Sequence, residues 1–349
     1  MSFTEFQKNK KENNSVEGTH KEPSLFTIMP ANHWIEQAKL RPIPKMLFAE
    51  LWHEKELAIL FADTNLGKSI LAVQIANAIS RGLQIPGFKL EATAQPILYF
   101  DFELSDKQFE TRYSKGYQDH FNFDSNFIRV EIDPDAEIPE HSTFEDFLNS
   151  SLERSIRDTG AKVLIIDNLT YLKNETEKAR DALPLMKHLK ALKNKYGLSI
   201  LALAHTPKRD LSKSITRNDL QGSKMLINFC DSAFSIGESA TDTSLRYIKQ
   251  IKARNTEHIY DTENVVVCQI NKPDNFLQFE FLHYGNEREY LRAGSDNDRN
   301  ELENEIKAIL ATDPNISAYA IAKQLCPDEA KFNSFKVKVS RVVNRISNI

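Results

Sequence analysis

This chain of 349 residues has few cysteines and few glycines, and its net charge is small. Its three cysteines (Cys230, Cys268 and Cys326) lie far apart and are odd in number, which argues against a disulfide framework or a zinc cluster and favours a reducing, cytoplasmic compartment. The formal net charge of −4 excludes a protein that coats nucleic acid by bulk charge, so any such contact must come from a local patch. The 11 glycines and 13 prolines are too few for a fibrous or low-complexity protein.

Long hydrophobic runs are missing as well. No window reaches the roughly 18 apolar residues that a membrane helix needs, so we expect no membrane association. The N-terminus lacks the apolar core of a secretory signal. Residues 1–23 are polar and mixed in charge, and we predict that they are disordered.

Apolar strands and amphipathic helices alternate from about residue 45 onward. The predicted strands are 56–62, 96–101, 128–132, 162–167 and 198–204, and the predicted helices are 70–79, 105–118, 143–158 and 178–196. This rhythm predicts an α/β fold with a mostly parallel sheet flanked by helices. Further strands at 232–237, 245–252, 264–270 and 276–283 are expected to extend the same sheet with antiparallel edges.

The first predicted strand ends in the P-loop pattern G-x-x-x-x-G-K-[ST], with Ala62 in place of the first glycine. Backbone N–H groups of such a loop, with the positive end of the following helix, surround the β-phosphate of a nucleotide. Gly67 allows close backbone approach, Lys68 would neutralise the β- and γ-phosphate oxygens, and the Ser69 hydroxyl would bind Mg²⁺. The predicted ATP-binding residues are Asp63, Thr64, Asn65, Leu66, Gly67, Lys68, Ser69 and Ile70.

Carboxylates follow two other predicted strands. Asp167 ends the apolar run 163–167 in the Walker B form, where it would hold Mg²⁺ through water. Asp101 and Glu103 stand at the end of the run 96–101, and open α/β sheets bind their ligands at this edge. We predict that Glu103 takes the proton from the attacking water and that Asp101 supports it.

Taken in order, these segments resemble the RecA-like ATPase core, and more closely the RepA-type, DnaB-like branch of hexameric helicases with its plasmid and mobile-element relatives. The resemblance covers roughly residues 45–285. Besides the segments above, the matching residues in that range are Asn168, His205, Gly222, Ser223, Lys252, Arg254 and Asn255. It implies that Glu103 is the catalytic glutamate and that His205 senses the γ-phosphate. It also implies that Lys252 and Arg254 contact the ATP of a neighbouring subunit, which makes the protein a homo-oligomer, expected to be a hexameric ring.

Two basic segments are candidates for contact with nucleic acid. The resemblance implies that the polar loop 207–220 faces a central channel and binds single-stranded DNA through Lys208, Arg209, Lys213 and Arg217, the alternative being a merely solvated loop. Residues 301–349 are predicted to form three short helices, one capped by Ser317. The last has an apolar face of Phe335, Val339, Val342, Val343 and Ile346, and a basic face of Lys338, Arg341 and Arg345. This suits a helix-turn-helix or winged-helix unit on duplex DNA, although a protein-docking bundle fits nearly as well.

The sequence thus predicts a tail at 1–23, a RecA-like ATPase domain at 24–285, a linker at 286–300 and a helix-turn-helix-like unit at 301–349. The predicted function is an ATP-hydrolysing motor on DNA that uses ATP and Mg²⁺, of the RepA-type helicase class. Two alternatives stay open. One is an ATP-switched DNA-binding accessory protein that does not separate strands, and the other is a DNA-binding module whose P-loop has decayed.

Overall fold

The structure is a computed structural model that describes residues 26–169, 182–207, 209–220, 223–292, 295–314, 316–326 and 332–347. The chain divides into two units, Met1–Ile43 and Pro44–Ile349. The described part of the first unit contains helix α2 (Ala31–Lys39), none of whose residues is buried. The tail predicted at 1–23 lies outside the described residues. Among the helices that are described, none is long and apolar enough to cross a lipid bilayer.

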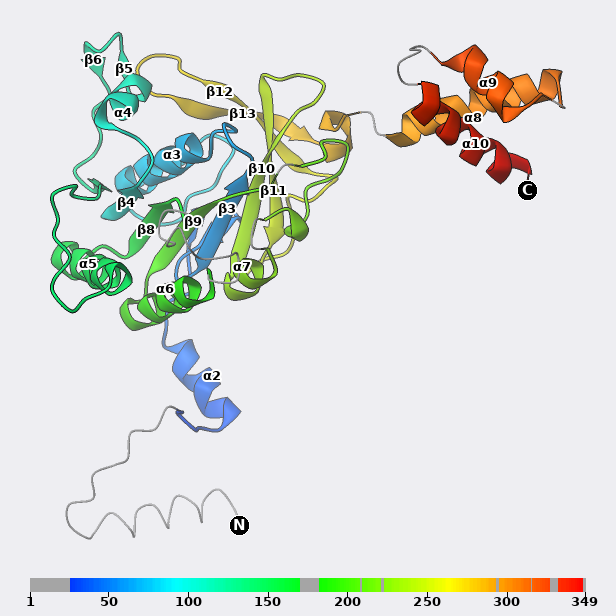
Figure 1. The fold of residues 1–349 in the computed structure, drawn as a ribbon. Coiled ribbons are helices and arrows are strands. Elements are labelled where there is room, and N and C mark those ends of the chain that lie inside the picture. Colours follow the sequence, from blue (N-terminus) through cyan, green and yellow to red (C-terminus); the bar gives the residue numbers. More distant parts are fainter. Residues whose placement is uncertain are drawn as a thin grey trace, which may run out of the picture. The chain divides into compact units, whose positions relative to one another are not determined.

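A nine-stranded sheet dominates the second unit (Figure 1). Its strands, in spatial order, are β13 (Gln278–Gly285), β12 (Val265–Asn271), β11 (Leu245–Lys252), β10 (Ser232–Glu238), β3 (Leu57–Ala62), β9 (Ser199–His205), β8 (Val163–Asp167), β4 (Ile97–Asp101) and β7 (Phe127–Val130). Neighbouring strands from β10 to β7 are parallel, whereas β11, β12 and β13 add an antiparallel edge. The predicted α/β core with a mostly parallel sheet is therefore confirmed, and so is its antiparallel extension.

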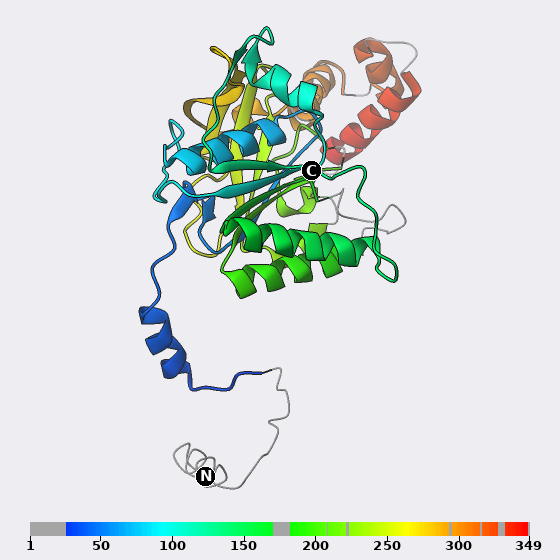
Figure 2. The ribbon, with the colours of Figure 1, turned by 90° about the vertical axis from the view of Figure 1, so that its left-hand side faces the viewer.

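Helices cover both faces of this sheet (Figure 2). Two hydrophobic cores result, one containing residues of α3 (Lys68–Arg81) and the other containing residues of α5 (Phe144–Thr159), α6 (Ala182–Tyr196) and α7 (Ser223–Phe229). Strand β3 alternates between them, because Ala58 and Leu60 belong to the first core and Ile59 and Phe61 to the second. All of β3 is buried, which explains why its sequence is a continuous apolar run.

The helix predicted at 105–118 is shorter in the structure. Helix α4 (Asp106–Arg112) starts at a Ser105 capping box, and a hairpin of β5 (Ser114–Lys115) and β6 (Asp119–His120) follows it. Gly116 and Tyr117 in the hairpin turn both have φ of 60°, which a right-handed helix does not accommodate. The prediction was therefore wrong at the C-terminal end of this helix. A second small hairpin, β1 (Met46–Phe48) with β2 (Trp52–His53), precedes β3.

Three helices follow the sheet, as predicted: α8 (Ser295–Thr312), α9 (Ala318–Leu325) and α10 (Phe332–Ser347). They share a small core of Leu302, Ile306, Ile321, Ala322, Val339 and Val342. Phe335, Val343 and Ile346 pack against that core, which confirms the predicted apolar face of the last helix. Ser317 caps α9 by accepting a hydrogen bond from the Ala320 N–H at 3.2 Å. The range 286–300, predicted as a linker, contains the 3-10 turn η4 (Glu287–Tyr290) and the start of α8.

Candidate active site

The phosphate-binding loop joins the central strand to a helix. Strand β3 ends at Ala62 and α3 begins at Lys68, so residues 63–67 turn at the carboxyl edge of the parallel strands. Asn65 (φ 64°) and Gly67 (φ 92°) adopt the left-handed conformation that this turn requires. The first turn of a helix offers free N–H groups and partial positive charge, so the loop suits a bound phosphate.

Ala62 is compatible with this loop although the pattern has glycine there. It lies within β3, is fully buried and pairs with His205 of β9, so its backbone is extended. Gly67, by contrast, has a φ of 92°, which residues with a side chain rarely adopt, and a Cβ there would lie 2.7 Å from Cδ1 of Ile270 in β12, so that Ile270 would have to shift. The loop therefore depends on its second glycine and not on its first.

Lys68 is held close to the backbone of the loop that precedes it. Its side chain is largely buried, and Nζ donates hydrogen bonds to the carbonyls of Ala62 at 3.1 Å and Asp63 at 3.0 Å. Burial lowers the pKa of Lys68, while the nearby charges of Glu103 and Asp167 oppose that effect. The ammonium group is thus placed in the loop, where phosphate oxygens can replace the carbonyls as its partners.

Asp167 ends β8 in an almost dry environment. Tyr99 Oη donates a hydrogen bond to Asp167 Oδ2 at 2.7 Å, and the carboxylate is 1 % exposed. Burial raises the pKa of Asp167 to about 6, although hydrogen bonds from Ser69 and Tyr99 act in the opposite direction. Among the described residues Asp167 Oδ1 has no hydrogen-bond partner. A buried, unsatisfied carboxylate oxygen beside the Ser69 hydroxyl is the oxygen-donor set that Mg²⁺ prefers, so these residues fit the predicted ion.

Glu103 lies beside two polar groups from neighbouring strand ends. Asn168 Nδ2 donates a hydrogen bond to Glu103 Oε1 and lies 3.0 Å from Nε2 of His205. His205 Nε2 is 3.5 Å from the same Glu103 oxygen. The interaction with His205 lowers the pKa of Glu103 and outweighs partial burial, with a further contribution from the charge of Lys68. Glu103 is therefore ionised at neutral pH, as a proton acceptor must be.

One cavity of about 200 Å³ brings the predicted groups together. Its lining consists of Thr64, Asn65, Gly67, Lys68, Ser69, Ile70, Glu103, Arg112 and His205. Arg112 was missed in the sequence, and its Nη1 is buried with no hydrogen-bond partner among the described residues. The sequence signal that could have pointed to Arg112 was its positive charge in the predicted helix that follows Glu103. Asn168 and Tyr99 were likewise not assigned roles, because their partners lie on other strands.

Lys252 and Arg254 do not reach this cavity in their own chain. Lys252 pairs with Ala233 near the start of β10, which puts it at the opposite edge of the sheet from Ala62. Its Nζ donates to the carbonyls of Ile227 at 2.5 Å and Cys230 at 2.7 Å. Arg254 contacts Asp231 at 3.2 Å, and its side chain is 49 % exposed. An exposed cation at that edge is available to a second molecule.

The predicted DNA-binding loop is only partly a solvent-facing basic surface. Lys213 is 77 % exposed and Arg217, in the 3-10 turn η3 (Arg217–Asp219), is also exposed. The Arg209 side chain is only 5 % exposed and lies 3.6 Å from Asp219. A phosphate contact by Arg209 does not fit this burial, because the guanidinium lies beside Asp219 and already donates a hydrogen bond to the Lys213 carbonyl at 2.9 Å. Lys208 lies outside the described residues.

The basic face predicted for the last helix is partly visible. Lys338 and Arg341 are exposed on α10, whereas the side chain of Arg345 lies outside the described part of the structure. Their exposure permits contact with an acidic partner but does not identify it.

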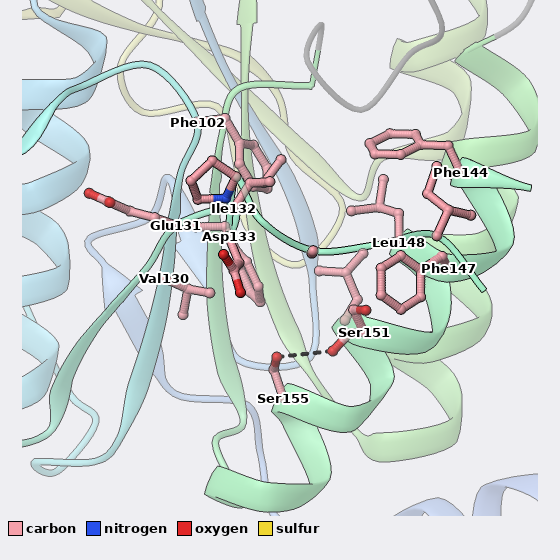
Figure 3. A pocket seen from close by; sticks show the side chains of 15 residues that line it. Phe102, Val130, Glu131, Ile132, Asp133, Phe144, Phe147, Leu148, Ser151 and Ser155 are labelled. Carbon is pink, nitrogen blue, oxygen red and sulfur yellow. Dashed lines mark hydrogen bonds between the residues drawn. The ribbon is translucent and has the colours of Figure 1, made fainter.

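An apolar groove of about 390 Å³ lies between edge strand β7 and helix α5 (Figure 3). Phe102, Ile132 and Phe144 are among the side chains that line it. The groove is separate from the phosphate cavity, but Phe102 directly precedes Glu103 in the chain. The turn that carries Glu103 therefore lies between a polar cavity and an apolar one.

Comparisons with known proteins give one matching family and many similar solved structures. A family model described as "AAA domain" matches residues 24–210. No curated protein matches the chain. Among solved structures, a KaiC-like protein from the hyperthermophilic archaeon Pyrococcus horikoshii OT3 is similar at 15 % sequence identity and a TM-score of 0.44, covering 66 % of this chain and 91 % of that one.

Proposed function

This chain belongs to the AAA domain family of P-loop ATPases, and we propose that it is an ATP-hydrolysing RecA-like motor that acts on DNA, of the RepA-type helicase class. The observation that carries the proposal is the meeting of three groups at one edge of the sheet: Lys68 begins the helix after β3, Glu103 follows β4 and Asp167 ends β8. Lys68 and Glu103 line one cavity, and Asp167 interacts with Ser69 of the same cavity. This is the set of groups that γ-phosphate hydrolysis needs.

Each side chain has a distinct task in the proposed reaction. The N–H groups of residues 63–69 and the Lys68 ammonium hold the phosphates of ATP. Ser69 and Asp167 would hold Mg²⁺, which when bound neutralises phosphate charge. Glu103 orients a water molecule and accepts its proton while the water oxygen bonds to the γ-phosphorus and the bond to the bridging oxygen of ADP breaks.

His205 and Asn168 connect this cavity to the loop that follows β9. Both contact Glu103, and β9 ends at His205, a short distance in sequence before the loop 207–220. Loss of the γ-phosphate therefore changes the charge next to His205. We expect that change to move the loop, whose exposed Lys213 and Arg217 contact single-stranded DNA phosphates. Lys338, Arg341 and Arg345 are the proposed contacts to duplex DNA.

A second copy of the chain completes the proposed site. Arg254 is exposed, yet it lies across the sheet from the phosphate loop of its own chain. It can stabilise charge on ATP only from a neighbouring subunit, as an arginine finger does, with Lys252 beside it. Repetition of such a contact between two different surfaces gives a ring or a filament, and we propose a closed homo-oligomeric ring of six subunits.

Two single variants and their mixture test the composite site. Lys68→Ala should abolish ATP hydrolysis, and Arg254→Ala should abolish hydrolysis while ATP binding, measured by titration calorimetry, is retained. A mixture of the two variants should regain activity, because some interfaces then combine an intact phosphate loop with an intact Arg254. Arg288→Ala, an exposed arginine in η4, is the matched control. Normal turnover by Arg254→Ala, or a single-copy mass in mass photometry with ATP, would contradict the proposal.

The DNA-dependent part needs separate measurements. The ATPase rate should rise when single-stranded DNA is added, and the rise should shrink in Lys213→Ala and Arg217→Ala. A forked duplex should be separated only when ATP is hydrolysed. DNA-stimulated hydrolysis without strand separation would instead identify an ATP-switched accessory protein.

A further inference from the structure

We infer that Arg129 is a positioning residue for the proposed proton acceptor, acting through the backbone turn that carries Glu103. The inference rests on the proposed function and adds a residue that lies outside the phosphate cavity. Arg129 is on edge strand β7, next to Tyr99 of β4 in the parallel register. Its side chain is 18 % exposed, so most of the guanidinium is used inside the protein.

All three nitrogen atoms of the guanidinium donate hydrogen bonds to the segment 101–106. Nε donates to Asp101 Oδ2 at 2.9 Å, and Nη2 donates to the carbonyl oxygen of Leu104 at 2.7 Å. Nη1 donates to Asp106 Oδ1 at 2.9 Å and also contacts Glu131. The group stacks over the ring of Phe109 in α4, 4.6 Å from its centroid. A planar fork can bridge these acceptors at fixed spacing, whereas the point charge of a lysine cannot.

Asp101 passes this constraint to Glu103. Asp101 Oδ1 accepts hydrogen bonds from the N–H groups of Glu103 at 3.2 Å and Leu104 at 3.0 Å, while its Oδ2 is bound to Arg129. The Asp101 side chain is completely buried, so its charge requires the Arg129 cation. The turn is thus fixed at two N–H groups and one carbonyl. This matters because the Glu103 side chain itself is 39 % exposed and its backbone must be held for it to keep one position.

The same turn borders the apolar groove (Figure 3). Phe102 and Glu131 both line that groove, and Glu131 contacts the Arg129 guanidinium. Arg129 therefore closes the space between the β7 edge and the turn on the polar side, while Phe102 packs on the apolar side. Without the guanidinium, the turn at 102–105 loses its bond at the Leu104 carbonyl, while among the described residues it keeps the hydrogen bonds to Asp101, the one from Phe102 N–H to the Asp167 carbonyl at 2.9 Å and the capping box at Ser105.

Arg129→Lys is the primary test, because it keeps a cation beside buried Asp101 and removes the fork. Displacement of a reacting group by about 1 Å can cost on the order of 10²-fold in rate. We expect kcat for ATP hydrolysis to fall by about 10- to 100-fold, with ATP affinity and the thermal midpoint close to those of the unmodified protein. Arg288→Lys, the same change at an exposed arginine in η4, is the matched control and should leave kcat unchanged.

A double variant shows whether Arg129 acts through Glu103. In single-turnover assays with labelled ATP, Arg129→Lys should add no further loss in a Glu103→Gln background, because the group that it positions is already disabled. Three results would overturn the inference: a normal kcat in Arg129→Lys, parallel loss of kcat and ATP affinity, or full additivity with Glu103→Gln. If the unmodified protein does not hydrolyse ATP at all, the proposed function is wrong, and the proposed role of Arg129 is wrong with it.

Discussion

Replacement of Lys249 by methionine should destabilise the protein strongly, because it leaves the buried negative charge of Glu287 without its counter-charge. Lys249 Nζ lies 2.5 Å from Glu287 Oε2, and the two side chains are 8 % and 0 % exposed. Lys249 also donates to the carbonyl of Ile215 at 3.0 Å, and Glu287 Oε1 accepts the Ile215 N–H at 2.7 Å. The ion pair therefore connects Ile215, in the loop 207–220, to Lys249 of β11 and to Glu287 of η4.

The size of the effect follows from desolvation. Breaking a buried ion pair by removing one partner costs about 3–5 kcal/mol, whereas replacing both partners by neutral groups is often nearly neutral. Lys249→Met should thus lose about 3–5 kcal/mol, a large part of a typical stability of roughly 5–15 kcal/mol. The double variant Lys249→Met/Glu287→Gln should recover most of that loss, because the glutamine oxygen still accepts the Ile215 N–H.

Urea unfolding followed by the fluorescence of buried Trp52 measures both variants. Lys89→Met is the control, since its ion pair with Glu91 is exposed and should leave the midpoint almost unchanged. Trypsin should also cut the loop at Lys213 and Arg217 faster in Lys249→Met. The reasoning is refuted if Lys249→Met costs no more than Lys89→Met, or if the double variant is less stable than the single one.

Three further predictions concern the phosphate cavity. The pKa of Asp167 in the fold, about 6, lies above its ordinary value of 3.8, so the folded state holds the extra proton and stability falls as pH rises from about 4 to about 6. Metal-free Asp167→Asn should therefore melt higher than the unmodified protein at about pH 7.5, by less at about pH 5, and should not hydrolyse ATP. Gly67→Ala should lose ATP binding in calorimetry, because residues with a side chain rarely adopt its φ of 92° and a methyl group there would force the Ile270 side chain to shift. Arg112→Met should weaken ATP binding by at least about tenfold, because it removes a cation from the phosphate cavity. Thermal stability should change little, because Nη1 of Arg112 has no hydrogen-bond partner among the described residues and its loss leaves no group unpaired.

Local order in the chain made much of the site predictable. Lys68 begins the helix that follows the apolar strand β3, Glu103 follows β4 and Asp167 ends β8, and parallel strands bring their carboxyl ends to one edge. The groups could therefore be placed together before any contact was known. The predicted helix 105–118 failed because its pattern gave no weight to the turn at Gly116 and Tyr117, whose backbone is left-handed.

Contacts between distant parts of the chain were not predictable in this way. Tyr99 bonds Asp167, 68 positions away, and Arg112 enters the cavity only because α4 ends where it does. Arg209 looked like a DNA contact as one of several cations in a polar loop, yet the structure buries its side chain. The sequence shows which residues carry a charge, whereas the burial of each side chain depends on the residues that pack against it in the fold.

The amino-acid order alone determined the strand–loop–helix rhythm, and with it the identity of the phosphate loop and the carboxylates, because these depend on neighbours within a few positions. Only the tertiary structure decided where the cations lie relative to that cavity. Register across the sheet places Arg254 at the far edge, folding of the β7 edge brings Arg129 against Asp101, and burial removes Arg209 from the surface. Electrostatic roles depend on distance and solvent exposure, and both are properties of the packed chain.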